Sequence, residues 1–237
     1  MTNTKNIFII VIILIFLAGG AWWYTQKGSF ILPIASGDTV ASWDFQGARE
    51  GNAQLEGQTR DEITRLEGML GGDQSGKDDE PTDYDIYVGI ANQYEMLGDG
   101  ETERGYLEKA LTIDSAKTGL AWHNLGSLMS RLGAFNTARI AYAKAVEAQP
   151  QVSSFHLSRI QFLTDHFAAD TSAVDGAFAE ASARFGDDAS ILQLQAAWFE
   201  ESDRTPEAIT ALTKMKTLMP SDAHAGIDAE ITRLQNR

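Results

Sequence analysis

The sequence predicts an all-α protein in which about four helix pairs stack into a solenoid, followed by a capping helix and preceded by a single transmembrane helix. Two observations carry this prediction. Ser115, Pro150, Phe185 and Pro220 follow one another at a constant interval of 35 residues. Residues 7–24 form an uninterrupted apolar run. A fixed period of this length is typical of stacked helical repeats, each of which buries its apolar face against its neighbours.

The apolar run near the amino terminus is long enough to span a bilayer. Residues 7–24 carry no charged side chain and end in the aromatic residues 22–24. As a helix at ~1.5 Å per residue the run covers ~27 Å, close to the hydrocarbon thickness, with the aromatic side chains at the headgroups. A cleaved signal peptide is the alternative, because Gly19 and Ala21 form a small-x-small cleavage pattern. We predict that residues 1–27 are an uncleaved anchor.

The basic residues around this run predict its orientation. Lys5 and the terminal amine precede the run, whereas Lys27 alone follows it. Positive charge favours the cytoplasmic side of a membrane. We therefore expect a single-pass protein of a bacterial-type plasma membrane whose repeats lie outside the cytoplasm.

Residues 28–81 are expected to link the anchor to the repeats. Residues 28–47 mix apolar and aromatic residues with Pro33 and Gly37 and show no helical period. Such a segment is expected to run extended and to pack on the membrane surface or on the later helices. Its Trp-Asp-Phe sequence at residues 43–45 equally suits a docking peptide.

A short amphipathic helix is expected later in the same linker. Residues 50–70 carry apolar side chains on one face between charged residues, and Gly71 and Gly72 follow as a stop signal. Residues 71–81 contain no large apolar residue, which predicts a flexible link before a repeat domain over residues 82–237.

The clearest repeat unit runs from Thr118 to Pro150. Its landmarks are Trp122, Leu125, Gly126, Met129, Gly133, Phe135, Ala138, Tyr142, Ala145 and Pro150. This pattern resembles the tetratricopeptide repeat (TPR) family, in which small residues stand where the paired helices cross and large ones fill the space between layers. A bulky side chain at Gly126 is therefore expected to be costly.

Three further units share the pattern to different degrees. Residues 83–115 match well, although Glu103 stands where the family has Ala. Residues 189–220 also match, and Thr205 with Pro206 predicts a capped start for their second helix.

Residues 153–185 match least, because Phe178 and Ala181 fit only after a one-residue slip. A bulge or longer turn near residues 168–170 is expected to absorb the slip. Residues 221–237 carry apolar residues on one face, which predicts a helix that caps the last repeat.

Composition excludes several kinds of chemistry. The chain has no cysteine, which rules out disulfides, thiol nucleophiles and cysteine-based zinc sites. None of the four histidines has a second ligand at the spacing that places both on one helix face. No phosphate-binding glycine loop follows a strand, and no nucleophile stands beside a base. We predict no catalytic residue, no metal, no cofactor and no enzymatic activity.

The net charge and the TPR resemblance together predict the partner. A formal charge of −14 disfavours nucleic acid and favours a protein or peptide, with basic ones preferred. The resemblance implies a groove lined by the first helix of each pair. The residues carried over to that groove are Val88, Asn92, Glu95, His123, Ser127, Ser130 and Phe162.

The function predicted on this basis is that of a membrane-tethered scaffold or adaptor. The alternative is a structural subunit of an envelope assembly that self-associates as a homo-oligomer, with the groove filled by its own linker from Phe30 to Phe45.

Overall fold

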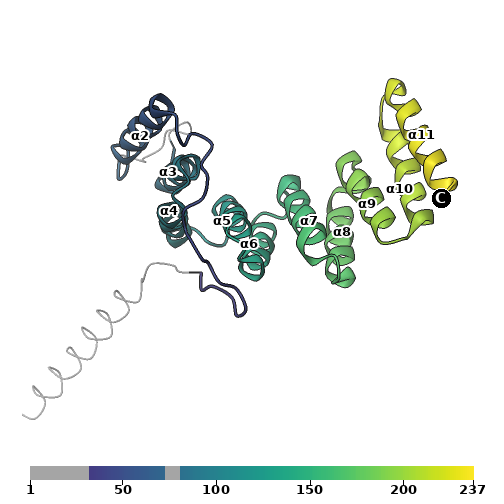
Figure 1. The fold of residues 1–237 in the computed structure, drawn as a ribbon, viewed down its shortest axis with the longest axis horizontal. Helices are drawn as coiled ribbons and strands as arrows, with labels where there is room; N and C mark the ends of the chain where they lie inside the picture. The colour runs from purple at the N-terminus through teal and green to yellow at the C-terminus, as the bar shows by residue number, and fades with distance from the viewer. Residues whose placement is uncertain (1–31, 73–80) are drawn as a thin grey trace, which may run out of the picture. The chain divides into compact units, whose positions relative to one another are not determined.

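The computed structural model describes residues 32–72 and 81–237, in which helices follow one another as antiparallel pairs (Figure 1). The chain divides into two units, Met1–Leu32 and Pro33–Arg237, and the described helices all belong to the second. The predicted anchor, residues 1–27, lies outside the described residues. Within the described ranges, no helix combines the length and the apolar character needed to cross a bilayer.

The described helices form four pairs with an additional helix at each end. The helix α2 spans Ala53–Glu67, inside the range 50–70 predicted for an amphipathic helix. The pairs are α3 (Asp83–Leu97) with α4 (Gly100–Ile113), α5 (Leu120–Arg131) with α6 (Phe135–Ala148), α7 (Ser153–Phe167) with α8 (Thr171–Phe185), and α9 (Ala189–Glu201) with α10 (Thr205–Leu218). The short 3-10 helix η1 (Ser221–Ala223) leads to α11 (His224–Gln235).

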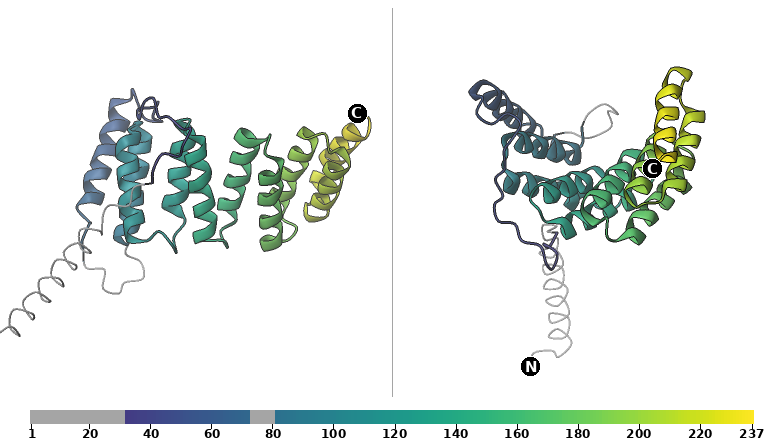
Figure 2. Two further views of the ribbon diagram at one scale, coloured as in Figure 1. Left: turned by 90° about the horizontal axis from the view of Figure 1, so that it is seen from below. Right: turned by 45° about the vertical axis from the view of Figure 1, so that its right-hand side comes forward.

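Consecutive pairs pack on one another in chain order, as the views of Figure 2 show. This order confirms the predicted all-α helical-repeat fold for the described residues.

Small residues set the distance between paired helices. A Cβ atom on Gly126 of α5 would come within 2.9 Å of the Tyr142 ring in α6, closer than real Cβ contacts. Ala138 and Ala145 of α6 are fully buried against the same helix pair. The expectation for Gly126 is therefore confirmed, because close packing leaves no room for a larger side chain.

Both helices of the second pair begin without a capping side chain of their own. The N–H of Ala121 in α5 donates a hydrogen bond of 2.9 Å to the buried Tyr84 hydroxyl from α3. The N–H of Thr137 in α6 donates one of 2.7 Å to the carboxylate of Asp38. The first N–H groups of a helix need acceptors, so residues from earlier in the chain complete these two helices.

The third repeat contains the extra residue that the sequence slip predicts. The buried residues of α8 each lie 36 positions after their counterparts in α6, as Phe178 does after Tyr142, whereas Ile160 lies 35 positions after Leu125. The additional residue therefore lies between Ile160 and the first buried residue of α8, Val174.

A partly exposed polar contact connects the fourth repeat with the third. Arg204 occupies the N-cap position of α10, so the prediction that the Thr205 hydroxyl caps this helix is wrong. The Arg204 guanidinium donates to both carboxylate oxygens of Asp175 in α8, at 2.7 and 2.8 Å. Trp198 of α9 donates its indole N–H to the same carboxylate at 2.8 Å. These hydrogen bonds, led by the one from Arg204, lower the pKa of Asp175.

Residues 33–52, which we call the strap, run along the edge formed by the turn between α3 and α4 and the turn between α5 and α6 (Figure 1). The Ala35 N–H donates to the Thr137 hydroxyl at 2.9 Å, and the Arg49 N–H donates to the Met96 carbonyl at 3.0 Å. The extended part of the linker therefore packs on later helices. Its described residues follow this edge instead of filling the groove.

Both ends of the row are covered by an additional helix. At the start, Ile63 of α2 packs with Ile86 and Ile90 of α3. At the end, Ile227 and Leu234 of α11 pack with residues of α9 and α10. The predicted capping helix is thus present over His224–Gln235.

Candidate functional site

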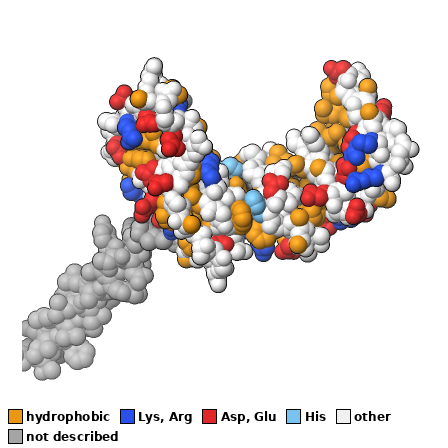
Figure 3. All heavy atoms as spheres, in the orientation of Figure 1, with side chains coloured by type: hydrophobic (Ala, Val, Ile, Leu, Met, Phe, Trp, Pro, Cys, Tyr) orange, Lys and Arg blue, Asp and Glu red, His pale blue; other side chains and the backbone are white. Residues whose placement is uncertain are grey.

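The first helices of the pairs, α3, α5, α7 and α9, line one side of the row, which we call the inner surface. Figure 3 shows a hollow here, with histidine side chains among hydrophobic and uncharged polar ones. Five of the seven predicted groove residues lie half-buried on this surface: Asn92, Glu95, His123, Ser127 and Ser130. Val88 and Phe162 are only 2% and 4% exposed, so their side chains belong mainly to the packing.

Three inner helices are connected by a continuous chain of polar contacts. Asn124 of α5 donates a hydrogen bond of 2.8 Å to the side-chain carbonyl of Asn92 in α3. His123 Nδ1 lies 3.3 Å from the Asn124 side-chain oxygen, and His123 Nε2 lies 2.9 Å from the Ser158 hydroxyl of α7. We call these four residues the polar chain. It combines the predicted groove residues Asn92 and His123 with Asn124 and Ser158.

Arg131, at the end of α5, connects the strap with the inner surface. Its guanidinium donates to the carboxylate of Glu95 on α3 and lies 4.5 Å from the centre of the Phe45 ring in the strap. A cavity of about 380 Å³ opens beside these three residues, lined also by Gln46, Ala48 and Met96. Sequence reasoning placed Glu95 here but did not identify Arg131, because its contacts are made with residues remote in the chain.

Glu103 of α4 is a buried acid close to this contact. Its side chain is only 2% exposed, and its Oε2 atom has no hydrogen-bond partner among the described residues. Burial, together with the charge of Glu95 and against the opposing charge of Arg131, raises the pKa of Glu103 to about 8. The carboxyl is therefore mostly neutral at pH 7, which explains how an acid occupies a position where the TPR pattern has Ala.

A cavity of about 400 Å³ on the inner surface lies between α5, α7 and α9. Phe162 and Tyr142 form its apolar part, with ring centres 5.0 Å apart. His166 lies beside them, stacked on Phe135 at 4.1 Å. The remaining lining residues are Ser130, Leu157, Ser158, Gln161, Asp165 and Leu194.

This arrangement is suited to binding. An apolar floor with a few polar groups around it can hold one side chain of a peptide while the polar groups contact its backbone. Across residues 32–72 and 81–237, no group of three His, Asp or Glu side chains is placed to hold a metal ion.

The histidines make structural contacts in the described repeats. His156 Nε2 lies 3.0 Å from the Pro150 carbonyl, and His224 Nε2 lies 3.0 Å from the Met219 carbonyl. These two residues contact backbone carbonyl groups of loops, whereas His123 and His166 face the inner surface.

Comparison with known proteins identifies the fold. No protein-family model matches the chain, and no curated protein matches it. A crystal structure of MamA superposes with a TM-score of 0.52 at 14% identity over 68% of this chain and 89% of that one. The crystal structure of YrrB, described as a TPR protein with an unusual peptide-binding site, superposes with a TM-score of 0.51 at 16% identity over 75% of this chain and 86% of that one. The described residues therefore form a TPR-like helical-repeat solenoid.

Proposed function

We propose that this protein is a membrane-tethered scaffold or adaptor that binds a protein or peptide through its inner surface, without enzymatic activity. The observation that carries the proposal is the cavity of about 400 Å³ between α5, α7 and α9. YrrB, which has a similar fold, is described as having a peptide-binding site, and this supports a binding function for a surface built in the same way.

The partner that fits this cavity best carries an aromatic or large apolar side chain beside a basic one. The small exposed parts of the Phe162 and Tyr142 rings offer apolar contacts, and Asp165 on the rim offers a negative charge. The net charge of −14 adds a long-range attraction for cationic partners.

The test uses the full-length protein in detergent and fluorescein-labelled peptide pools of equal length. One pool is cationic with a central Trp, one is cationic without it, and one is anionic with it. We expect the cationic Trp pool to bind tightest in fluorescence anisotropy. Reversing the charge with Asp165→Lys should weaken that binding about tenfold, the equivalent of ~1.4 kcal/mol.

Glu147→Lys is the matched control, because it makes the same change of charge on the exposed side of α6, the second helix of its pair. It should change the affinity less than about twofold, since a distant surface charge is screened by salt. Equal losses for the two variants, or equal binding of the anionic pool, would show that the cavity does not select the ligand.

The amino-terminal run supports the tether. Residues 7–24 should keep the protein in the membrane fraction after alkaline carbonate washing, and removal of residues 1–27 should release it. Protease added outside intact cells should digest the repeats if they lie on the extracytoplasmic side.

A further inference from the structure

The strap contacts the repeats mainly through its backbone. The Phe45 N–H donates to the Gly98 carbonyl at 3.0 Å, and the Gly100 N–H donates to the Trp43 carbonyl at 2.9 Å. Asp44 and Asp99 thereby form an antiparallel bridge. Main-chain pairing of this kind is how an extended peptide binds to an exposed edge of a folded protein.

The turn between α3 and α4 is shaped for this contact. A Cβ atom on Gly98 would lie 2.0 Å from the Phe45 carbonyl oxygen, and one on Gly100 would lie 2.5 Å from the Trp43 carbonyl oxygen. Gly133 occupies the corresponding position 35 residues later, with a similar φ of +75° against +81° for Gly98, and a Cβ there would meet nothing within 4 Å. The close approach at Gly98 is therefore specific to the strap.

Asp38 supplies the charged contact at the neighbouring turn. Its carboxylate accepts hydrogen bonds from the N–H and side chain of Asn136 at 3.2 and 2.8 Å, and from the N–H and hydroxyl of Thr137, both at 2.7 Å. Partial burial acts to raise the pKa of Asp38, but these hydrogen bonds outweigh it and lower the pKa. The ionised carboxylate completes the amino terminus of α6 in the way a bound anion does.

The strap adds almost nothing to the core. Between residues 33 and 52 only Gly47 is buried. Trp43 and Phe45 are partly exposed and lie beside the guanidinium groups of Arg104 and Arg131, at 5.1 and 4.5 Å from the ring centres. A segment held by backbone hydrogen bonds, one carboxylate and two cation–π contacts can leave without opening the core of the repeats.

From these contacts we propose that the edge formed by Gly98–Gly100 and the start of α6 is a second peptide-binding site, separate from the inner surface, whose built-in ligand is the strap. Its ligand is an extended peptide with an aspartate for the amino terminus of α6 and, five to seven residues later, a Trp-Asp-Phe stretch for the glycine turn. The strap of the same chain fills the site, and a strap peptide in solution competes for it.

The contact between Phe45 and Arg131 couples this site to the inner surface, because the position of the Arg131 side chain depends on whether the strap is bound. Arg131 stacks on the strap and pairs with Glu95 of the inner surface at the same time. Departure of the strap removes one of the two contacts that orient the Arg131 side chain.

The experiment uses the full-length protein in detergent and a labelled peptide of residues 33–50. Asp38→Ala loosens the chain's own strap but leaves the receptor edge unchanged, so this variant should bind the peptide at least about tenfold tighter than the unchanged protein does. Gly98→Ala blocks the receptor edge and should bind no peptide. The same peptide with Asp38→Ala should bind weakly to every variant.

Amide hydrogen exchange gives an independent measurement. Gly98→Ala should lower the protection of the Phe45 and Arg49 amides at least about tenfold, whereas Gly133→Ala, with the same backbone strain, should leave it within about threefold. Unchanged protection of the α7 amides confirms that the repeats of each variant are folded. Equal peptide binding by the Asp38→Ala and Gly98→Ala proteins, absence of binding to the Asp38→Ala protein, or equal effects of the two glycine substitutions would refute the proposal.

Discussion

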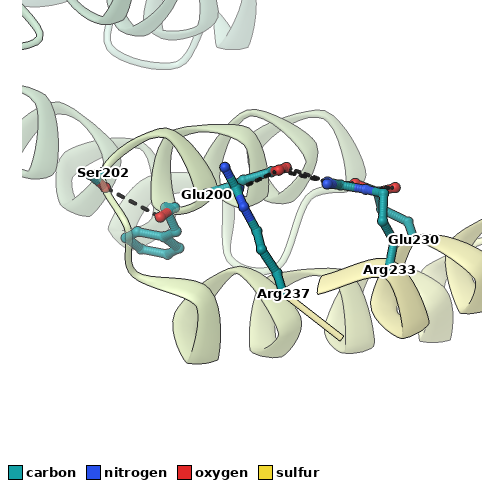
Figure 4. Close-up of polar contacts among 6 residues, drawn as sticks. Glu200, Ser202, Glu230, Arg233 and Arg237 are labelled. Atoms are coloured by element: carbon teal, nitrogen blue, oxygen red, sulfur yellow. Dashed lines mark hydrogen bonds and ion pairs between the residues drawn. The ribbon is translucent and has the colours of Figure 1, made fainter. Parts of the chain in front are cut away.

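The two ends of the repeat row are each covered by an additional helix, but the contacts that these helices make differ. Each terminal repeat has an apolar face that its neighbour does not cover. At the start, α2 covers it with a buried cluster of isoleucines. At the end, α11 covers it with a few apolar side chains and a set of exposed ion pairs, which Figure 4 shows around Glu200.

The ion pairs at the carboxyl end connect α11 with α9. Glu200 of α9 accepts hydrogen bonds from Arg233 at 2.7 Å and from Arg237 at 2.9 Å, and Arg233 also pairs with Glu230 of its own helix (Figure 4). Side chains this exposed contribute little to stability, because water and salt screen them. Buried apolar side chains therefore hold both ends, and the exposed ion pairs at the carboxyl end add little.

The largest effect is expected in the isoleucine cluster at the amino-terminal end. Ile90→Ala removes a fully buried side chain from the contact between α2 and α3. It should lower the free energy of unfolding by about 3–5 kcal/mol, because the helices cannot close the resulting cavity. Guanidinium titration followed by circular dichroism measures this loss. Ile140→Ala, at a position 43% exposed on α6, is the control and should cost less than about 1 kcal/mol.

A smaller effect is expected from the matching change at the carboxyl-terminal end. Leu234→Ala shortens a side chain that is 2% exposed, near the end of α11. We expect a loss of about 2–3 kcal/mol, confined to this helix, because a terminal helix frays without unfolding the rest. Hydrogen exchange should show faster exchange in α11 and unchanged protection in α5. An equal loss of protection along the whole row would mean that the ends are not independent.

The buried acid at the amino-terminal end should give a pH-dependent difference. The pKa of Glu103 is raised to about 8 in the folded state, from an ordinary value of 4.5. Its favourable contribution is therefore complete below pH 4.5 and is lost as the pH rises through 8, because the folded state binds the proton more tightly than the unfolded state. Glu103→Gln removes this dependence.

The stability of Glu103→Gln relative to the unchanged protein should accordingly rise between pH 5 and 8, by about 1–3 kcal/mol. The groups that face Glu103 are Glu95, Asp99 and Arg131, and all three remain in the variant. A pH-independent difference in thermal unfolding would contradict the assignment of the raised pKa to this carboxyl.

The smallest effect is expected at the exposed ion pairs. Arg233→Ala removes the contacts with Glu200 and Glu230 and should cost less than about 1 kcal/mol. This loss should shrink further in 0.5 M NaCl, whereas that of Ile90→Ala should not. A salt-resistant loss above about 2 kcal/mol would contradict this, because it would mean that packing of the Arg233 side chain stabilises this end and not its ion pairs.

The repeat fold could be predicted because its information is local and periodic. Gly126, Ala138 and Tyr142 occupy repeat positions that are set by the crossing of the paired helices. The one-residue shift of Phe178 from the repeat spacing predicted an extra residue, which the structure contains. The path of the strap could not be predicted, because an extended segment has no period. Asp38 reaches its partner Thr137 across 99 positions of sequence.

The candidate site shows the same limit. The TPR resemblance implied that His123 and Asn92 lie on the inner surface, whereas the role of Arg131 depends on its contact with Phe45, a residue in another element. Glu103 stood out in the sequence as a departure from the repeat pattern. Its burial depends on how α4 packs with neighbouring elements, which a single helix does not reveal.

The polar chain has a mechanical consequence. In a row of helical hairpins each hairpin contacts only its neighbours, so small movements between neighbours add up along the row. The polar chain connects α3, α5 and α7 along the inner surface. A motion that moves these helices apart there must stretch its hydrogen bonds, whereas a motion that brings them together need not. The first three repeats thus resist opening on this side more than they resist closing.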